Sequence, residues 1–230
     1  IIVQNSIMDE LLQKLKAKIE SITRRIGAPS NPESTMGPLI SEKQLRNVER
    51  LVNGALDGGN AVSLIGAKRM VSQSPLDGFN FEKGYFYEPT LLTSSKERNS
   101  IVKTSIWREE AFGPVIVVAG FDTEEEAITL ANDTEFGLGA GVWTLDLSQA
   151  FRVSEQIDAG ITWVNTHHRN DPSSPWGGAK SASGVGSENG IEAYNAYTTS
   201  KSTIINYASP DECLAAEDWF ADGSGNVRYG

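Results

Sequence analysis

The fold is decided by residues 114–165, PVIVVAGFDTEEEAITLANDTEFGLGAGVWTLDLSQAFRVSEQIDAGITWVN, in which apolar runs alternate with helical repeats. The pattern predicts strands over 114–121, 138–144 and 160–165 and helices over 123–131 and 146–157. Apolar strands that alternate with helices are typical of a parallel sheet covered on both faces. The sequence therefore predicts an α/β fold with an open, mostly parallel sheet and helices on both faces.

The residues before this stretch extend the same alternation. An amphipathic helix is expected over 6–26, and a second over 41–57, where Ser41 and Gln44 form a capping-box pattern. A short buried strand is expected over 61–65 and an extended segment over 85–92.

The chain divides by composition into one main domain and two appendages. Residues 1–196 form the domain, and residues 197–207 alternate as a strand does. Residues 208–230 form an acidic tail rich in small residues. The loop over 165–190 is dominated by Gly, Ser, Pro and Asn, as a functional loop is.

Composition narrows the class of protein. The net charge of -10 and the scattered 20 Lys+Arg residues argue against a nucleic-acid partner. No apolar run reaches the length of about 18 residues needed to cross a membrane. One cysteine, Cys213, and two histidines exclude an intrachain disulfide and a Cys/His zinc cage. A cytoplasmic location and no metal are therefore expected.

Seven motifs in one order carry a resemblance. They are Ile1-Ile2-Val3-Gln4, Met36-Gly37-Pro38-Leu39-Ile40-Ser41, Gly84-Tyr85-Phe86 with Glu88-Pro89-Thr90, Glu109-Glu110-Ala111-Phe112-Gly113-Pro114-Val115, Asn132-x-Thr134-x-Phe136-Gly137-Leu138, Ala159-Gly160-Ile161-x-Trp163-Val164-Asn165, and Pro175-Trp176-Gly177-Gly178-x-Lys180. In these residues the chain resembles the aldehyde dehydrogenase superfamily over roughly 1–207. The resemblance implies that family's α/β catalytic domain, followed by a strand that joins subunits.

The resemblance also implies what the isolated chain lacks. In the family the cysteine nucleophile lies a few residues before the Ile1–Gln4 stretch, and the dinucleotide-binding domain precedes that cysteine. Cys213 lies in an acidic neighbourhood that suppresses a thiolate, so it is expected to be inert. We therefore expect no cofactor for the isolated chain, and NAD or NADP only where the missing N-terminal domain is supplied. The absence of Met at position 1 suggests processing or a longer precursor.

The candidate catalytic residues are His167, His168, Arg169 and Glu110. Imidazole titrates near neutral pH, and Arg169 could orient a carbonyl or carboxylate. The alternative is a pair of surface histidines. By the resemblance, Glu110 and Phe112 match positions that contact the nicotinamide ribose and ring. In the isolated chain these contacts would be vestigial, and the residues would form a structural turn.

The candidate substrate-binding residues lie around the predicted loop and its neighbours: Trp163, Asn165, Trp176, Phe112 and Phe136. Aromatic side chains could form one apolar wall of a pocket, although core packing is the favoured reading for Trp163 and Phe136. The loop departs from the family after Gly178, with an extra residue and Ser187 in place of arginine. This change indicates either altered use of the site or drift.

Three functions are compatible with these residues. The leading hypothesis is a repurposed, cofactor-independent non-redox enzyme, an isomerase, lyase or cyclase, that acts on a small, largely apolar substrate. The second is the C-terminal part of an NAD(P)-dependent aldehyde dehydrogenase that works only with its missing half. The third is a non-catalytic regulatory subunit. Such a subunit would pair with full-length relatives through its last strand. For the chain itself a homodimer or other homo-oligomer is expected, because the predicted last strand is apolar and unpaired.

Overall fold

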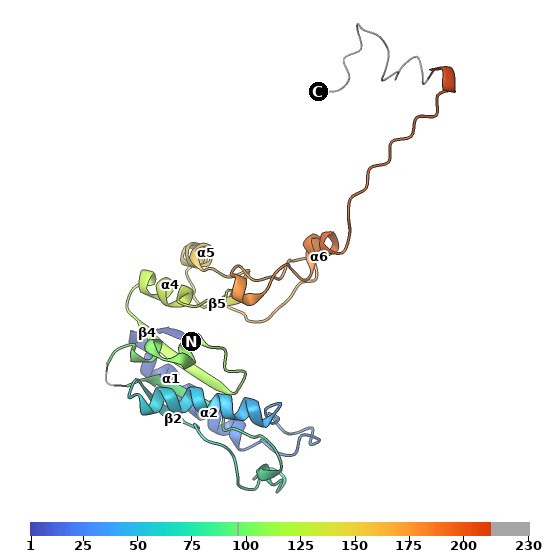
Figure 1. Cartoon of the computed structure of the whole chain (residues 1–230). Helices are drawn as coiled ribbons and strands as arrows, with labels where there is room; N and C mark the ends of the chain where they lie inside the picture. The colour runs from blue at the N-terminus through green and yellow to red at the C-terminus, as the bar shows by residue number, and fades with distance from the viewer. Residues whose placement is uncertain (96, 213–230) are drawn as a thin grey trace.

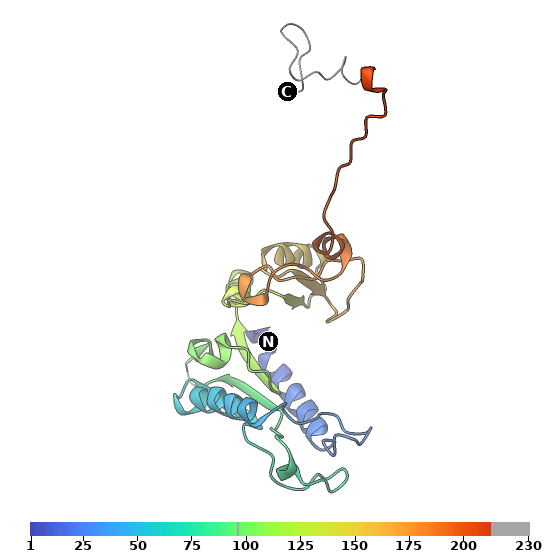
Figure 2. The ribbon, with the colours of Figure 1, turned by 45° about the vertical axis from the view of Figure 1, so that its right-hand side comes forward.

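The computed structural model describes residues 1–95 and 97–212 of the chain. Within residues 1–196 it consists of an N-terminal unit, residues 1–121, and a C-terminal unit, residues 122–196 (Figure 1). The chain passes between the units once, where β4 ends and α4 begins (Figure 2).

The N-terminal unit is built on a four-stranded sheet with the order β1-β4-β3-β2. Its elements are β1 (Ile2–Gln4), α1 (Asn5–Thr23), α2 (Glu42–Asp57), β2 (Ala61–Ile65), η1 (Phe81–Lys83), β3 (Thr90–Ser94), η2 (Ser100–Lys103), α3 (Ser105–Arg108) and β4 (Val115–Phe121). β4 lies parallel to both β1 and β3, whereas β2 and β3 are antiparallel.

The C-terminal unit is built on a separate pair of parallel strands. Its elements are α4 (Glu124–Asn132), β5 (Gly139–Val142), α5 (Leu147–Gln156), β6 (Ile161–Val164), η3 (Ser181–Ser183) and α6 (Gly190–Ala196).

The two long helices cover opposite faces of the four-stranded sheet. Leu91 and Val118 pack on the α1 side together with Ile19. The next residues along each strand, Leu92 and Ala119, pack with apolar residues of α2. Because neighbouring strand residues point to opposite faces, β3 and β4 divide their side chains between two cores.

A third cluster fills the far end of the N-terminal unit. It contains Ile26, Met70, Phe81 and Phe86. The Phe81 and Phe86 rings lie 4.9 Å apart between centroids, and both side chains are fully buried. This cluster joins the end of α1 to the segment that precedes β3.

The predicted fold class is confirmed, with two differences in detail. Helices cover both faces of the larger sheet, and the pairings of β4 and of β5 with β6 are parallel. The strands belong to two sheets rather than one. The helix α4 lies beside β1 and β4, whereas among the described residues β5 pairs only with β6. β1 was not anticipated, since it spans only Ile2–Gln4 and carries no alternating pattern long enough to read.

The segment after α6 leaves the body as an extended chain (Figure 1). Ile204 is 96% exposed, and no strand pairing is assigned to residues 197–207 among the residues described. A strand is stabilised only when it pairs with another, so a role of this segment in joining subunits stays a prediction. The predicted domain boundaries also stay predictions. Cys213 and the rest of the tail to residue 230 lie outside the described residues.

Within the described part of the chain, no helix combines the length and the apolar character needed to span a bilayer. Over the same residues, no group of His, Cys, Asp and Glu side chains is arranged to hold a metal ion.

Asp77 anchors the loop that follows α1 and gives the N-terminal unit a pH-dependent contact. Its carboxylate accepts hydrogen bonds from the Asn31 amide at 2.8 Å and from the backbone N–H of Ala28 at 2.9 Å. These bonds, led by that from Asn31, lower the pKa of Asp77 from 3.8 to about 2. Bonds to the charged form favour ionisation, so the carboxylate stabilises the folded state above pH 3.8.

We expect this stabilisation to disappear as the pH falls from 3.8 through about 2, because the proton then binds the folded state as well. The measurement is the difference in free energy of unfolding between the wild type and Asp77→Asn across this range. Asn31→Ala, which removes the largest cause of the shift, should move the loss to higher pH. A difference that does not change with pH would contradict the assignment.

Candidate functional site

The first candidate site is the turn Glu110–Pro114, which leads from α3 into β4. The Gln44 amide on α2 donates a hydrogen bond of 2.6 Å to the Ala111 carbonyl oxygen. A Cβ atom on Gly113 would lie 2.6 Å from a methyl group of Val48, so the turn packs directly on α2. The turn is therefore held by contacts with α2.

An ion pair beside the turn holds the same segment. Arg50 of α2 lies 2.7 Å from the Glu109 carboxylate, and this hydrogen bond lowers the pKa of Glu109 below its usual value. Both side chains are half exposed, so the pair orients the Glu109 segment relative to α2 but stabilises the fold little.

Phe112 projects from this turn. Its φ is +46°, in the left-handed region that non-glycine residues seldom adopt, and its side chain is 70% exposed. Glu110 is also exposed. A strained aromatic residue presented to solvent by a fixed backbone is a feature of binding sites.

The second candidate site is a cluster of aromatic rings where β6 enters the loop. Trp163 is buried, and its ring centroid lies 5.3 Å from that of His167 and 6.4 Å from that of Trp176. The His168 ring lies 5.4 Å from Trp176. Both histidines are exposed, so the cluster has a buried floor and an open rim.

Backbone contacts give the loop its shape. The Trp163 indole donates a hydrogen bond of 2.8 Å to the Arg169 carbonyl oxygen. Trp176 and Glu188 exchange two backbone hydrogen bonds of 2.7 Å, which close the loop at its base. His168 has a φ of +56°, so the turn over the Trp163 ring uses a left-handed residue.

Lys180 ties the loop to the end of α4. Its ammonium donates to the carbonyl oxygens of Asn132 at 2.9 Å and Thr134 at 3.0 Å. It also lies 3.6 Å from the Asp158 carboxylate. The family-like lysine of the Pro175–Lys180 motif therefore has a structural use in this chain.

The structure brings together four of the predicted site residues, His167, His168, Trp163 and Trp176, on the C-terminal unit. Glu110 and Phe112 lie on the N-terminal unit, and no ring contact or hydrogen bond links the two groups among the described residues. Both polar groups of the Asn165 side chain bond to the backbone of Thr144, at 3.0 Å and 2.8 Å. Phe136 is half buried and lies on the segment before β5.

Comparison with known proteins matches residues 1–203 to the model of the aldehyde dehydrogenase family. The chain belongs to the aldehyde dehydrogenase family. It is 38% identical over 212 residues to betaine aldehyde dehydrogenase of Cereibacter sphaeroides, covering 92% of this chain and 40% of that protein. It is 36% identical over 205 residues to phenylacetaldehyde dehydrogenase of Pseudomonas fluorescens, covering 89% of this chain and 38% of that protein.

Solved structures of the family agree with the fold. Betaine aldehyde dehydrogenase of Staphylococcus aureus in complex with NAD+ matches with a TM-score of 0.77 and 35% identity, over 91% of this chain and 40% of that one. The chain thus spans about 40% of the length of the relatives it matches. The predicted resemblance is confirmed.

Sequence reasoning singled out the loop and the turn but missed the residues that join the two units. Arg98, Arg108 and Asp133 make ion pairs across the boundary between the units. Charged residues on helix and loop surfaces carry no local signal of such pairing, because their partners lie 24 or more residues away.

Proposed function

We propose that this chain is the C-terminal part of the catalytic domain of an NAD(P)-dependent aldehyde dehydrogenase. It would oxidise aldehydes together with the part that its relatives carry in addition. The observation that carries the proposal is Phe112, which is 70% exposed, has a left-handed backbone conformation and lies in a turn that is hydrogen-bonded to α2. By the resemblance, Glu110 and Phe112 stand where the family contacts the nicotinamide ribose and ring.

The register of β1 supports the same proposal. Ile2 pairs with Ala119, and the two strands are parallel. A polypeptide that continued upstream of Ile1 in this register would run beside Val115 toward the Gly113 turn. In the family the cysteine nucleophile lies a few residues before this stretch. A thiol on such a segment would therefore lie near Phe112.

Within such an assembly the residues of this chain have distinct tasks. A bound nicotinamide dinucleotide would supply the hydride acceptor. The Phe112 ring offers an apolar face to the nicotinamide, and the Glu110 carboxylate can accept hydrogen bonds from ribose hydroxyl groups. The cluster of Trp163 and Trp176 would orient an apolar part of the aldehyde.

The other two hypotheses stay predictions. A non-redox enzyme that used His167 and His168 would require a site that encloses its substrate, whereas both histidines are exposed. A hollow of about 500 Å³ lies elsewhere, between the end of α4, α3 and the β1–β4 side of the sheet. A homodimer or homo-oligomer formed through residues 197–207 is part of this proposal, and so is a small-molecule aldehyde as substrate.

The test is complementation. The chain is expressed together with the remaining part of the Cereibacter sphaeroides betaine aldehyde dehydrogenase, ending where the match to Ile1 begins. We expect NADH to form from betaine aldehyde or phenylacetaldehyde with the mixture and not with either part alone. Phe112→Ala should lower turnover by about tenfold or more, since it removes a group that orients the cofactor.

Phe151→Ala is the matched control, because Phe151 is 64% exposed but lies on α5, away from the turn. It should leave turnover unchanged. The proposal fails if the two parts co-elute and still form no NADH. Conversion of an aldehyde by the chain alone, without NAD+, would instead support the non-redox hypothesis.

A further inference from the structure

We infer that Arg98 and Arg108 are positioning residues that fix the orientation of the C-terminal unit against the N-terminal unit. They hold α4 at its two ends. Through α4 they would set where the loop over residues 165–190, here called the aromatic loop, lies relative to the Phe112 turn, Glu110–Pro114. The catalytic part of this inference rests on the proposed function, but the structural part does not.

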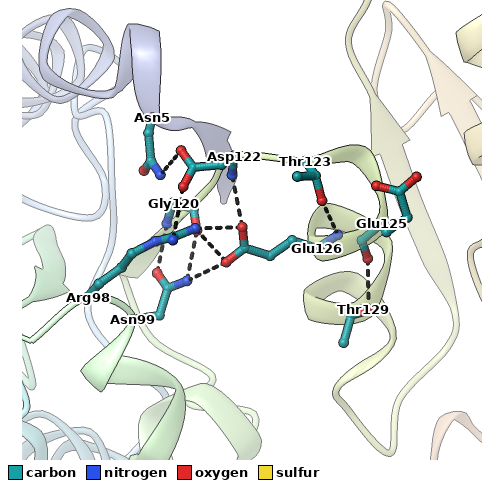
Figure 3. A network of polar contacts seen from close by, with 9 residues as sticks. All are labelled: Asn5, Arg98, Asn99, Gly120, Asp122, Thr123, Glu125, Glu126 and Thr129. Carbon is teal, nitrogen blue, oxygen red and sulfur yellow. Dashed lines mark hydrogen bonds and ion pairs between the residues drawn. The ribbon is translucent and has the colours of Figure 1, made fainter.

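The first contact lies at the start of α4 (Figure 3). The Arg98 guanidinium lies 2.9 Å from the Asp122 carboxylate and 2.5 Å from that of Glu126. Asn5 donates a hydrogen bond of 2.7 Å to Asp122 from the other side. Asn99 is bonded to both backbone groups of Gly120, so the segment that carries Arg98 is itself fixed to β4.

The same end of α4 is capped within its own chain segment. The backbone N–H of Glu126 donates to the Thr123 hydroxyl at 3.2 Å, and the Glu126 carboxylate accepts from the backbone N–H of Asp122 at 2.9 Å. Arg98 therefore forms an ion pair with the Glu126 carboxylate, which also takes part in capping α4 (Figure 3).

The second contact lies at the other end of α4. Arg108 of α3 donates two hydrogen bonds to the Asp133 carboxylate, at 2.9 Å and 3.1 Å. The Trp107 indole donates a third, also at 3.1 Å. A bidentate guanidinium pair fixes direction as well as distance. The two arginines thus hold α4 at points separated by almost its full length.

Packing gives α4 little other support. None of its residues is buried, and the hollow of about 500 Å³ lies between the end of the helix and the β1–β4 side of the sheet. Leu130 and Ala131 line this hollow from the helix, and Val115 and Val117 line it from the sheet. A helix without a close-packed base can tilt, so its direction depends on the contacts at its ends.

The aromatic loop should move together with α4, because side-chain contacts join the two. Lys180 bonds to the carbonyl oxygens of Asn132, the last residue of the helix, and of Thr134 just after it. Arg152 of α5 makes two hydrogen bonds to the Glu124 carboxylate, at 2.6 Å and 2.7 Å. A change in the direction of α4 would therefore carry α5 and the aromatic loop with it.

Exposed ion pairs contribute little to stability. Removing Arg98 or Arg108 should therefore leave each unit folded, while it frees the end of α4 that the arginine contacts. This separates a positioning role from a general structural one, and it can be measured without any assay of activity.

The structural test uses the full chain with Cys213→Ser and one spin label on each unit, at Lys43→Cys of α2 and Glu155→Cys of α5, which are both exposed positions. We expect one narrow distance distribution by pulsed electron resonance. Arg98→Met and Arg108→Met should each broaden it. Lys103→Met is the matched control, because its 2.7 Å ion pair with Glu97 lies within the N-terminal unit. Equal widths in all of these variants would overturn the inference.

The kinetic test uses the complemented enzyme. In Arg98→Met the KM for the aldehyde should rise by about tenfold, because the aromatic loop moves, while the KM for NAD+ stays unchanged, because the Phe112 turn is held by Gln44. Arg98→Lys should restore part of the loss. A fall in kcat alone, with both KM values unchanged, would show that the variant only loses folded protein, and would overturn the catalytic part. If wild type shows no turnover, the proposed function fails, and the distance measurement still decides the structural part.

Discussion

Gly160→Ala should destabilise the C-terminal unit by about 3 kcal/mol and displace the aromatic loop. A Cβ atom on Gly160 would lie 1.6 Å from the carbonyl oxygen of Gly177, which is backbone and cannot rotate away. Neither segment can retreat easily, since the Gly137 carbonyl oxygen accepts hydrogen bonds of 2.9 Å from Gly160 and from Ala179. The expected result is a lower denaturant midpoint and a changed Trp fluorescence, because Trp176 adjoins Gly177.

Gly141→Ala is the matched control. Gly141 lies in the neighbouring strand β5, and its added Cβ would find its nearest neighbour at 3.7 Å, an ordinary contact. Its midpoint should stay close to that of the wild type. If the denaturant midpoint fell equally in both variants, the cause would be the replacement of glycine as such and not the contact with Gly177.

Phe86→Ala should cost about 3–5 kcal/mol, because it removes a fully buried aromatic side chain from a small cluster. The Phe86 ring lies 4.9 Å from Phe81 and 5.7 Å from Phe79, so its removal leaves a cavity that two other rings line. The neighbouring backbone has little freedom to close it, since Phe86 accepts a hydrogen bond of 3.0 Å from Met70. Urea unfolding followed by far-UV circular dichroism measures the loss.

Tyr197→Ala is the control for the loss of an aromatic ring as such, because Tyr197 is 93% exposed. It should change the free energy of unfolding little. If Phe86→Ala were equally mild, the cluster of Ile26, Met70, Phe81 and Phe86 would not be a core of the folded protein.

Local signals in the sequence were sufficient to predict the four longest helices, α1, α2, α4 and α5, and the fold class, but not the short helices α3 and α6. Ser41 caps α2 and Thr123 caps α4 through the hydrogen bonds that their spacing implies, each of 3.2 Å. Helix caps and apolar repeats involve residues within one or two turns, so one sequence reveals them. The pairing of β2 with β3 and the division into two sheets depend on contacts between distant residues, which no local pattern encodes.

The candidate site shows the same limit. The sequence located the turn at Phe112 and the loop with its histidines, because motifs of glycine, proline and aromatic residues mark such segments. It treated Gln44 as part of a helix cap, whereas the side chain of Gln44 bonds to Ala111 in the turn. Whether a polar side chain serves its own helix or a distant loop depends on the folded arrangement. The non-redox function predicted first has gained no support from that arrangement.

The division of β3 between two cores limits how this chain can vary. Leu91 serves the core beneath α1 and Leu92 serves that beneath α2, so each residue from Thr90 to Thr93 has a fixed side. Inserting or deleting one amino acid there would turn every later side chain of the strand to the wrong helix. Changes of length during evolution should therefore collect in the segments outside the sheet, such as the loop over 181–187.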